Sequence, residues 1–514
     1  MNMQELWAEN AALKKELSST KSQLEVAEAR CALLSQQKFK SKSEKHPGQT
    51  ELDFDLNEAE VLVDQQTTDE ELQVVPEHTR AKSKRQPKLI PDHLPRVEVH
   101  HSCDSAVCPC CNETMQPITP IEQEQLACLP SKFYVIKHVY EKLSCKCKAQ
   151  APIEAKRPKR AIPGSQISEL ALATWIEQKY DQGLPLYRLE RIAKGANVEV
   201  ARESLARWII QVSKNYFQPL VNLMNDAVLS YDIVCVDETS LQVLREPGRA
   251  AESKSQLWIR RGGPPGQESI VLDYSPSRSA ATCESLLSGF QGYVVSDAYA
   301  AYLKLGKQET IDNVLCSDHA RRKFKEAYDT LDKKARKGSL ADQALQRYGK
   351  LYKLEQDYKK ADLSHRLQMR EQQAKPLWDA FMAWAAKIQG QGVAHHKTAQ
   401  AIAYLLKHKA GLQTYLQDAR LPISNIAAEH VAKHVAVARK NFLFVCTPSG
   451  AQASANCFSV IQTAKLHGHH VHKYLAVILT ELPKADNPDG FEQFLPWNIS
   501  AEKVNELYQK LPLI

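Results

Sequence analysis

The sequence lacks the hydrophobic segments that a membrane-spanning or exported protein requires. Its 514 residues contain no run of about 18 or more apolar residues, so no membrane span is expected. The N-terminus, Met-Asn-Met-Gln-Glu-Leu-Trp, has neither a basic segment before an apolar one nor a small-residue cleavage site. These absences predict a cytoplasmic protein that does not contact a membrane.

A strong excess of either charge is absent as well, and so is the cysteine pattern of a small secreted protein. The chain has 67 Lys and Arg against 60 Asp and Glu, and this net charge of +7 says little about nucleic-acid binding until the charges are located. Thirteen cysteines in a long chain without an export signal predict reduced thiols or thiolate-bound metal. The length exceeds what one compact core can hold and predicts several domains.

The first 95 residues are expected to form a coiled coil and a linker. Residues 1–37 carry a heptad repeat that places Leu6, Leu13 and Leu34 on one face of a helix. This apolar face predicts a coiled coil that joins copies of the chain into a homo-oligomer. Because the heptad repeat is short and only partly apolar, the alternative is an amphipathic helix that packs against its own chain. Residues 38–95 are polar, acidic first and basic later, which predicts a flexible linker.

Two pairs of cysteines follow within residues 96–160. Cys108 and Cys111 form one knuckle, and Cys145 and Cys147 form a second one after a strand-like stretch. Four thiolates from two knuckles are a ligand set that structural Zn²⁺ prefers, so we expect a zinc-binding module. Only one residue separates Cys145 from Cys147, fewer than in most zinc knuckles, so the identity of the fourth ligand is not fixed by the sequence. The other candidate ligands are Cys103, Cys110 and Cys128. Reduced cysteines without a metal are the alternative.

Residues 161–226 have the pattern of a helix-turn-helix-like DNA-binding unit. Helical periodicity runs over residues 168–194 and is interrupted within this stretch at Gly183-Leu184-Pro185, and a second helix is expected over residues 204–212. These helices carry the basic residues Arg188, Arg191, Lys194, Arg202 and Arg207. Basic helices joined by a short turn fit a unit that docks on DNA, although helical pairs also occur in proteins of many other functions.

Two predicted strands of residues 227–326 end on acidic residues. One β-branched run ends on Asp237, and a later one ends on Asp297 and leads into a helix expected to begin at Ala298. A hairpin and a helix lie between them, and strand, strand, strand, helix, strand, helix is the order of a ribonuclease H-like fold. The first and fourth strands are neighbours in that fold, so the two carboxylates meet and need a divalent cation between them.

A pair of magnesium ions held by carboxylates suits phosphodiester cleavage, but such a site needs a third acid. Residues 423–434, Ile-Ser-Asn-Ile-Ala-Ala-Glu-His-Val-Ala-Lys-His, contain Glu429 and are followed by Arg-Lys-Asn-Phe-Leu-Phe at residues 439–444. This stretch resembles the signature of bacterial insertion-sequence transposases of the IS66 type, in which the glutamate completes an Asp-Asp-Glu triad. Other matching segments are Val236–Thr239, Ser296–Tyr299, Cys316–Phe324, Leu184–Tyr187 and Thr463–Gly468. The resemblance spans about residues 84–485.

The resemblance implies a DNA transposase that cleaves phosphodiester bonds at transposon ends and transfers the strand to target DNA. Asp237, Asp297 and Glu429 are then the catalytic residues and the ligands of two Mg²⁺ or Mn²⁺ ions in the active site. The implied partner is double-stranded DNA, both transposon ends and target, together with companion proteins encoded by the same element. The implied location is the bacterial nucleoid.

The fold that the resemblance implies is multidomain α/β, with a ribonuclease H-like catalytic core. Residues 227–326 form the first part of this core, and residues 419–447, which contain Glu429, form the second part. A helical insertion of residues 327–418 separates the two parts, which is compatible with chain physics because the entropy of loop closure grows only logarithmically with length. A helical region of residues 448–514 completes the chain.

Some residues depart from the family pattern. His430 stands where an arginine usually follows the glutamate, Lys433-His434 stand where arginine-proline is usual, and Ser240 replaces an expected proline. A lysine keeps the charge but not the two-pronged grip of an arginine on phosphate. Two alternatives therefore accompany the enzymatic hypothesis. One is a catalytically inactive protein that binds or regulates transposon ends, and the other is a simple nuclease.

Basic residues around the expected site are predicted to bind the DNA backbone. They are Arg321, Arg322, Lys323, Lys433, Arg439 and Lys440. His319 is a candidate for orienting a scissile phosphate or a water, with a hydrogen bond inside the fold as the alternative. The histidine-rich tract of residues 467–472 has no acidic or thiolate partner nearby, so we expect it at the surface.

Overall fold

The computed structural model describes residue 90 and residues 94–103, 107, 110–129, 132–146, 151–393 and 395–513. The coiled coil predicted for residues 1–37 and nearly all of the predicted linker lie outside these residues. The described part is a mixed α/β protein with two β-sheets. The chain divides into two compact units, one of Met1–Leu223, Ser240–Gln256 and Val435–Ile514 and the other of Met224–Thr239 and Leu257–His434.

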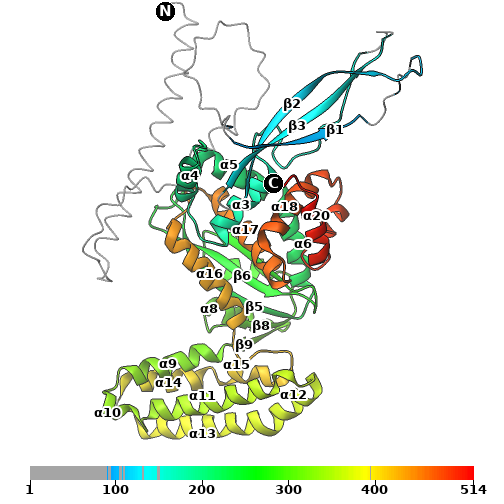
Figure 1. Cartoon of the computed structure of the whole chain (residues 1–514). Coiled ribbons are helices and arrows are strands. Elements are labelled where there is room, and N and C mark those ends of the chain that lie inside the picture. Colours follow the sequence, from blue (N-terminus) through cyan, green and yellow to red (C-terminus); the bar gives the residue numbers. More distant parts are fainter. Residues whose placement is uncertain are drawn as a thin grey trace, which may run out of the picture. The chain divides into compact units, whose positions relative to one another are not determined.

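A four-stranded sheet opens the described part of the first unit. Its strands are β1 (Arg96–His101), β2 (Gln116–Leu129), β3 (Lys132–Ser144) and β4 (Ile153–Glu154). β3 is parallel to β1 and antiparallel to β2 and β4, and β2 and β3 form the long hairpin seen in Figure 1. The Phe-Tyr-Val-Ile run of β3 is buried and consists of the aromatic and β-branched residues that favour strands.

Helices follow this sheet in the first unit. The first of them are α3 (Glu169–Tyr180), α4 (Leu186–Gly195) and α5 (Arg202–Val212). The hydroxyl of Ser168 accepts a hydrogen bond from the amide of Ala171 and caps α3. Gly183, with a φ of 73°, and Pro185 separate α3 from α4, because a positive φ favours glycine and a proline cannot continue a helix. The interruption predicted from these two residues is confirmed.

The C-terminal helices also belong to the first unit. They are α17 (Pro448–Leu466), α18 (Val471–Glu481), α19 (Asp489–Glu492) and α20 (Ala501–Gln509). The surface position expected for the histidine tract is wrong for His469 and His472, which are buried. Nε2 of His469 lies 2.7 Å from the carbonyl oxygen of Pro496, and Nε2 of His472 lies 2.9 Å from the hydroxyl of Thr174. Partners far away in the sequence therefore make the burial of these two side chains possible.

The second unit contains a five-stranded sheet in the order β7-β6-β5-β8-β9. Its strands are β5 (Ile233–Gln242), β6 (Lys254–Gly262), β7 (Ser269–Ser275), β8 (Gly292–Ser296) and β9 (Ile311–Leu315). β8 runs parallel to β5 and to β9. A Cβ at Gly292, where φ is 122°, would collide with the carbonyl oxygen of Asp232. Glycine is therefore required where β8 enters beside β5.

Two short helices connect the strands of this sheet, α7 (Ala280–Leu286) and α8 (Ala300–Leu305). The helix expected from Ala298 begins two residues later, at Ala300. The carboxylate of Asp297 accepts a hydrogen bond from the amide of Tyr299 at 2.9 Å and so holds a turn ahead of the helix. Strand β5 also differs from the prediction, because it continues past Asp237 to Gln242 instead of ending there.

A helical insertion follows β9 in the second unit. Its helices are α9 (Ser317–Asp329), α10 (Lys333–Arg336), α11 (Leu340–Asp357), α12 (Leu363–Met369), α13 (Lys375–Gln391), α14 (His396–Lys407) and α15 (Lys409–Gln413). Figure 1 shows the long helices lying alongside one another. Phe324, Tyr348, Trp378 and Phe381 pack in the core between them. None of the described helices is long and apolar enough to cross a membrane.

The buried guanidinium of Arg370 ties the end of the insertion together. It donates two hydrogen bonds to the carboxylate of Glu355, at 3.0 and 2.7 Å. It also donates to the carbonyl oxygens of Tyr415, Asp418 and Leu421. A buried charge is tolerated when its partners satisfy all of its donors, and these five bonds do so. The segment that leads towards Glu429 is thereby held in one position.

Candidate active site

Asp237 and Asp297 lie at the same level on two neighbouring strands. The parallel pairing of β5 with β8 joins Cys235 to Val295, and the same register continued by two residues sets Asp237 beside Asp297. The two strands run in the same direction, so both acids lie towards the carboxyl end of the sheet. In open sheets with parallel strands this edge is where ligands bind.

Glu429 reaches the sheet from the first turn of α16 (Ile426–Phe442). Just before this helix, Nδ2 of the buried Asn425 donates to the carbonyl oxygen of Val236 at 2.7 Å. The amide of Asn425 donates to Sγ of Cys316 at 3.2 Å. Val236 precedes Asp237, and Cys316 directly follows β9. Asn425 therefore ties the start of the helix that carries Glu429 to two strands of the sheet.

Three side chains contact the buried carboxylate of Glu429. Sγ of Cys316 and Nδ1 of His319 each lie 3.6 Å from Oε1, and Arg322 lies 3.6 Å from Oε2. The ligand atoms of Cys316, His319 and Glu429 all lie within 4.8 Å of one another. The guanidinium of Arg322 offsets the negative charge of the buried carboxylate, and the thiol of Cys316 donates to it. His319, a candidate for catalytic support, thus lies beside the third acid of the expected triad.

The carboxylates act on one another electrostatically. Burial, together with the negative charges of Glu238, Asp297 and Glu429, raises the pKa of Asp237 to about 7. The amide of Glu238, which donates to Oδ1 of Asp237 at 2.8 Å, opposes this shift. Neighbouring carboxylates disfavour each other's ionised forms unless a cation lies between them. The carboxylate oxygens of Asp237, Asp297 and Glu429 would fit Mg²⁺ or Mn²⁺, whereas the ligand atoms that lie within 4.8 Å of one another in the described residues are those of Cys316, His319 and Glu429.

A fourth acid, Glu238, adjoins Asp237 but is engaged by other side chains. Nε of Arg278 donates to its carboxylate at 2.8 Å, and the hydroxyl of Tyr302 donates to its other oxygen. Arg278 in turn stacks on the ring of Tyr299 at 4.0 Å from the centroid. Only 5% of the Glu238 side chain is exposed. This network engages both carboxylate oxygens of Glu238 with Arg278 and Tyr302.

Three of the basic residues expected to bind DNA, Arg321, Arg322 and Lys323, are exposed on α9. This helix begins directly after β9, beside the carboxylates. Lys323 lies 4.7 Å from the ring centroid of Tyr404 on α14. Burial, with a contribution from the charge of Asp297, raises the pKa of the Tyr404 hydroxyl to about 12.

The other three basic residues lie on α16 and differ in exposure. Lys433 and Lys440 are exposed, as is His430. Arg439 is half-buried and donates to the carbonyl oxygen and the hydroxyl of Ser240. Burial lowers the pKa of Arg439. Ser240, one of the departures from the family pattern, thus accepts hydrogen bonds from an arginine that was expected to bind DNA.

The cysteine module is described in part. Sγ of Cys111 and Sγ of Cys145 lie 3.3 Å apart, as two ligands of one ion would. Cys103 and Met115 pack against Cys145. The predicted ligands Cys108 and Cys147 lie outside the described residues, and the side chain of Cys128 is not described.

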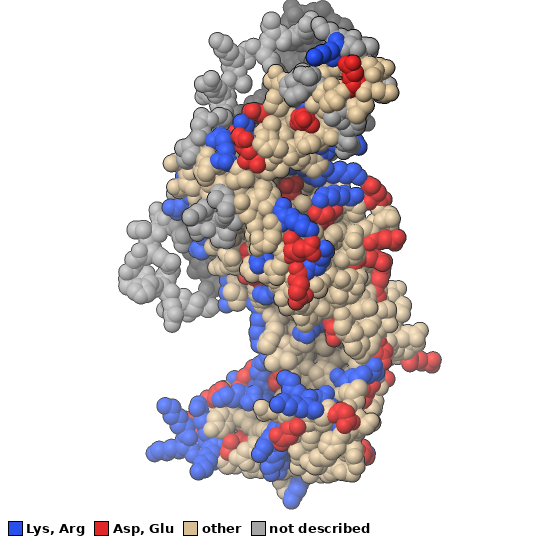
Figure 2. All heavy atoms as spheres, turned by 45° about the vertical axis from the view of Figure 1, so that its right-hand side comes forward, with Lys and Arg blue, Asp and Glu red and all other residues tan. Residues whose placement is uncertain are grey.

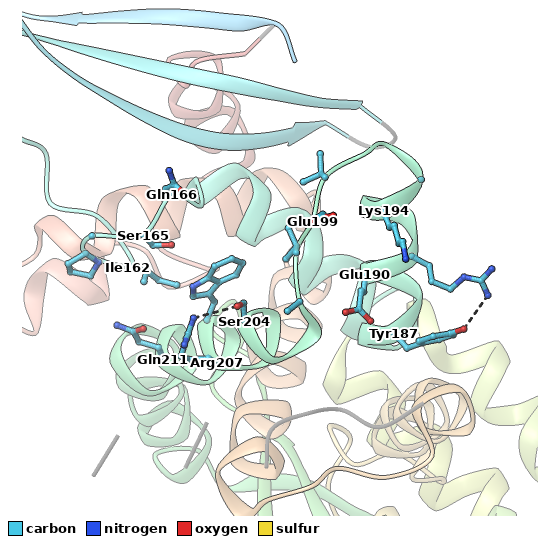
Figure 3. A pocket seen from close by; sticks show the side chains of 18 residues that line it. Ile162, Ser165, Gln166, Tyr187, Glu190, Lys194, Glu199, Ser204, Arg207 and Gln211 are labelled. Atoms are coloured by element: carbon cyan, nitrogen blue, oxygen red, sulfur yellow. Dashed lines mark hydrogen bonds between the residues drawn. The ribbon is translucent and has the colours of Figure 1, made fainter. Parts of the chain in front are cut away.

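An open groove of about 1580 Å³ lies among the helices of the first unit. It is lined by α4, α5 and residues 162–166, and Figure 3 shows Tyr187 and Lys194 on one side of it and Arg207 on the other. Arg191 also lines the groove and donates to the hydroxyl of Tyr187 at 3.2 Å. Three of the five basic residues noted on these helices therefore face one groove.

Sequence reasoning missed several residues of the site. Asn425, Arg278 and Tyr302 were not singled out, and Cys316 was noted only as part of a longer motif. Their roles depend on partners at least 40 residues away, such as Val236 for Asn425. The preference of asparagine for the residue before a helix does not account for Asn425, because Oδ1, the atom that would cap the helix, has no hydrogen-bond partner in the described part of the chain.

Comparison with known proteins identifies the family of this chain. Residues 164–453, more than half of the chain, match the family model described as Transposase IS66 family. The chain belongs to the IS66 transposase family. Three further models match outside this range. They cover residues 27–99 (Transposase C of IS166 homeodomain), residues 105–148 (zinc-finger binding domain of transposase IS66) and residues 459–497 (IS66 C-terminal element).

Relatives of this IS66 family member occur in Sinorhizobium fredii (strain NBRC 101917 / NGR234). Uncharacterized protein y4jD is 28% identical over 473 residues, which cover 90% of this chain and 91% of that protein. Uncharacterized protein y4qI is 28% identical over 393 residues, 74% of this chain and 71% of that protein. The family and domain matches support a transposase that has DNA as a partner and binds structural zinc.

Proposed function

We propose that this IS66 transposase cleaves phosphodiester bonds at transposon ends and joins the freed 3′-hydroxyl to target DNA. The observation that carries the proposal is geometric: the parallel register of β5 and β8 sets Asp237 beside Asp297, and the bond from Asn425 to the carbonyl oxygen of Val236 holds the helix of Glu429 against the same strand. The sheet order β7-β6-β5-β8-β9 supports a ribonuclease H-like core, because the strands that carry Asp237 and Asp297 are neighbours in it.

In this proposal Asp237, Asp297 and Glu429 hold two Mg²⁺ or Mn²⁺ ions. Such ions would supply the activation of the attacking hydroxyl and the stabilisation of the leaving oxygen in an in-line displacement at phosphorus. The same carboxylates serve both steps, hydrolysis at the transposon end and attack on the target. Asn425 acts as a positioning residue, because its hydrogen bonds hold the helix of Glu429 against the strand of Asp237.

The surrounding basic and polar residues handle the DNA. Arg321 and Lys323 neutralise phosphates next to the scissile bond, and Lys433 and Lys440 do so along α16. His319 contacts Glu429 at 3.6 Å and orients the carboxylate or the scissile phosphate. These contacts fix the register of the strand without reading its bases, so sequence recognition is left to other parts of the chain.

The N-terminal modules recognise ends and assemble the protein. Cys108, Cys111, Cys145 and Cys147 hold the structural zinc, and the 3.3 Å separation of Cys111 and Cys145 supports two members of this set. The helices that line the groove of Figure 3 dock on DNA. Residues 1–37 join copies of the chain through a coiled coil, and companion proteins of the same element act with the assembled protein.

The test is a cleavage and joining assay on a labelled duplex that carries the element's own ends, with Mg²⁺ or Mn²⁺. Wild type is expected to give both nicked and joined products, and Asp297→Asn neither. Asp312→Asn is the matched control, because Asp312 is exposed on the neighbouring strand β9 and receives no role. Equal product yields from wild type and Asp297→Asn would rule out this triad, and nicks without joining would point to a nuclease.

A further inference from the structure

Positive charge is concentrated in the helical insertion. Between Ser317 and Gln417 the sequence has 20 Lys and Arg but only 10 Asp and Glu, whereas the rest of the chain has 47 and 50. The insertion therefore carries the entire positive excess of the protein. Its core is aromatic and apolar, so the packing of the insertion does not account for this excess.

The excess includes a cluster at one end of the insertion. Lys333, Lys334 and Lys337 are exposed on and just after α10, and within the described residues none of the three forms an ion pair. Figure 2 shows blue side chains gathered at the lower left, the side on which Figure 1 places α10. Three unpaired lysines so close together repel one another, and a polyanion would relieve that repulsion.

The cluster is held in place by α9. Arg336 donates to the carbonyl oxygen of Asp329, the last residue of α9, at 2.7 Å, and to that of Leu331, just after the helix, at 3.0 Å. Its guanidinium lies 5.5 Å from the ring centroid of Tyr328, which Lys325 approaches on α9 at 5.2 Å. The orientation of α10 is thus determined by contacts rather than left to a flexible loop.

The same helix connects the cluster to the carboxylates. α9 begins beside Glu429, which Arg322 approaches to 3.6 Å, and it is 13 residues long. At 1.5 Å per residue its length is about 20 Å. At 3.4 Å per base pair this distance corresponds to about six base pairs of duplex DNA.

Helix α14 extends the basic surface along α9. It packs antiparallel to α9, since Tyr404, towards the end of α14, lies beside Lys323 in the middle of α9, whereas His395, just before α14, lies 3.4 Å from Thr330, just after α9. Lys397, close to that far end, is exposed. A backbone that leaves the active site along α9 therefore meets positive side chains on two helices.

We propose that Lys333, Lys334 and Lys337 bind phosphates of duplex DNA about six base pairs from the scissile phosphate. The insertion then acts as an electrostatic arm that holds the duplex on one side of the site. The inference rests on the proposed function for the position of the scissile phosphate. The phosphates belong either to the DNA that flanks the element or to the element itself, and the backbone chemistry is the same in both cases.

The test measures binding of the full-length protein to a labelled duplex of the element's end as the KCl concentration varies. Replacing all three lysines by glutamine removes about three phosphate contacts, so the slope of log affinity against log salt becomes shallower by about 3. The advantage of wild type over this variant is then about 40-fold larger at 50 mM than at 200 mM KCl. Far-UV circular dichroism and thermal unfolding confirm that the variant is folded.

The matched control replaces Lys353, Lys359 and Lys360 by glutamine. These three lysines are exposed too, and they lie at the opposite end of the insertion, on α11 and just after it. The control is expected to keep the wild-type slope. Equal slopes for wild type and the α10 variant, or an equal change in the control, would overturn the proposal.

Two further experiments ask which DNA is bound, the flank or the element, and whether the proposed catalytic triad is correct. Shortening the flanking duplex to three base pairs removes the difference between wild type and the α10 variant if the flank is bound, and leaves it if the element is bound. Either result supports a duplex-binding arm. Asp297→Asn should bind with the wild-type slope, so loss of joining in that variant tests the triad independently of the arm.

Discussion

Replacing Asp237 by asparagine should stabilise the metal-free protein. Burial and three neighbouring carboxylates raise the pKa of Asp237 from 3.8 to about 7. Below the unfolded pKa the carboxyl is neutral in both the folded and the unfolded protein, and the fold has its full stability. As the pH rises through the folded pKa, the folded protein must accept an ionised carboxylate that it disfavours, and this stability is lost. At pH 8 the ionised carboxylate therefore destabilises the fold.

The magnitude follows from the size of the shift. At 1.36 kcal/mol per pKa unit, the shift corresponds to about 4 kcal/mol. Water reaches part of the Asp237 side chain. Solvent screening therefore reduces the expected increase in the unfolding free energy of Asp237→Asn to about 2 kcal/mol. Asparagine keeps the oxygen that accepts the 2.8 Å hydrogen bond from the amide of Glu238, so the substitution removes the charge without removing this acceptor.

The assay is urea unfolding in EDTA at pH 8 and at pH 4. Asp237→Asn should exceed wild type in unfolding free energy at pH 8 and match it near pH 4, while exposed Asp312→Asn should match wild type at both. Mg²⁺ should then raise the stability of wild type much more than that of Asp237→Asn, because the variant has lost a ligand. If Asp237→Asn is no more stable than wild type at pH 8, the ionised Asp237 carboxylate does not destabilise the fold, and the reasoning is wrong.

Other predictions concern positioning, pH and zinc. Asn425→Ala should lower the cleavage rate about 100-fold, because it releases the helix of Glu429 from the carbonyl of Val236; single-turnover kinetics with unchanged DNA affinity is the measurement, and a wild-type rate would contradict it. Burial lowers the pKa of His472 to about 4, so wild type should lose up to about 3 kcal/mol of stability as the pH falls from 6.5 to 4, and His472→Gln should lose less; equal losses in urea unfolding would contradict it. Cys145→Ser should reduce bound zinc by one ion per chain in elemental analysis, whereas Cys283→Ser should not; full zinc occupancy in Cys145→Ser would exclude it as a ligand.

Much of the local structure of this protein follows from patterns that act over a few residues. The break between α3 and α4 is set by Gly183 and Pro185, whose backbone preferences are the same in any fold. The order of strands and helices around Asp237 and Asp297 follows from β-branched runs and turn residues. The family likeness added Glu429, which no local pattern connects to the other two acids.

The tertiary structure decided how those residues combine. Several features depend on partners that lie 27 to nearly 300 residues away in the sequence. These features are the burial of His469 and His472, the hydrogen bonds from Arg439 to Ser240 and the role of Asn425. Hydrogen bonds require donor and acceptor to lie about 3 Å apart, and charge effects are largely screened beyond about 10 Å, so sequence spacing alone cannot tell which polar groups meet. Local preferences determined the elements of this transposase, and only their packing determined which side chains share a site.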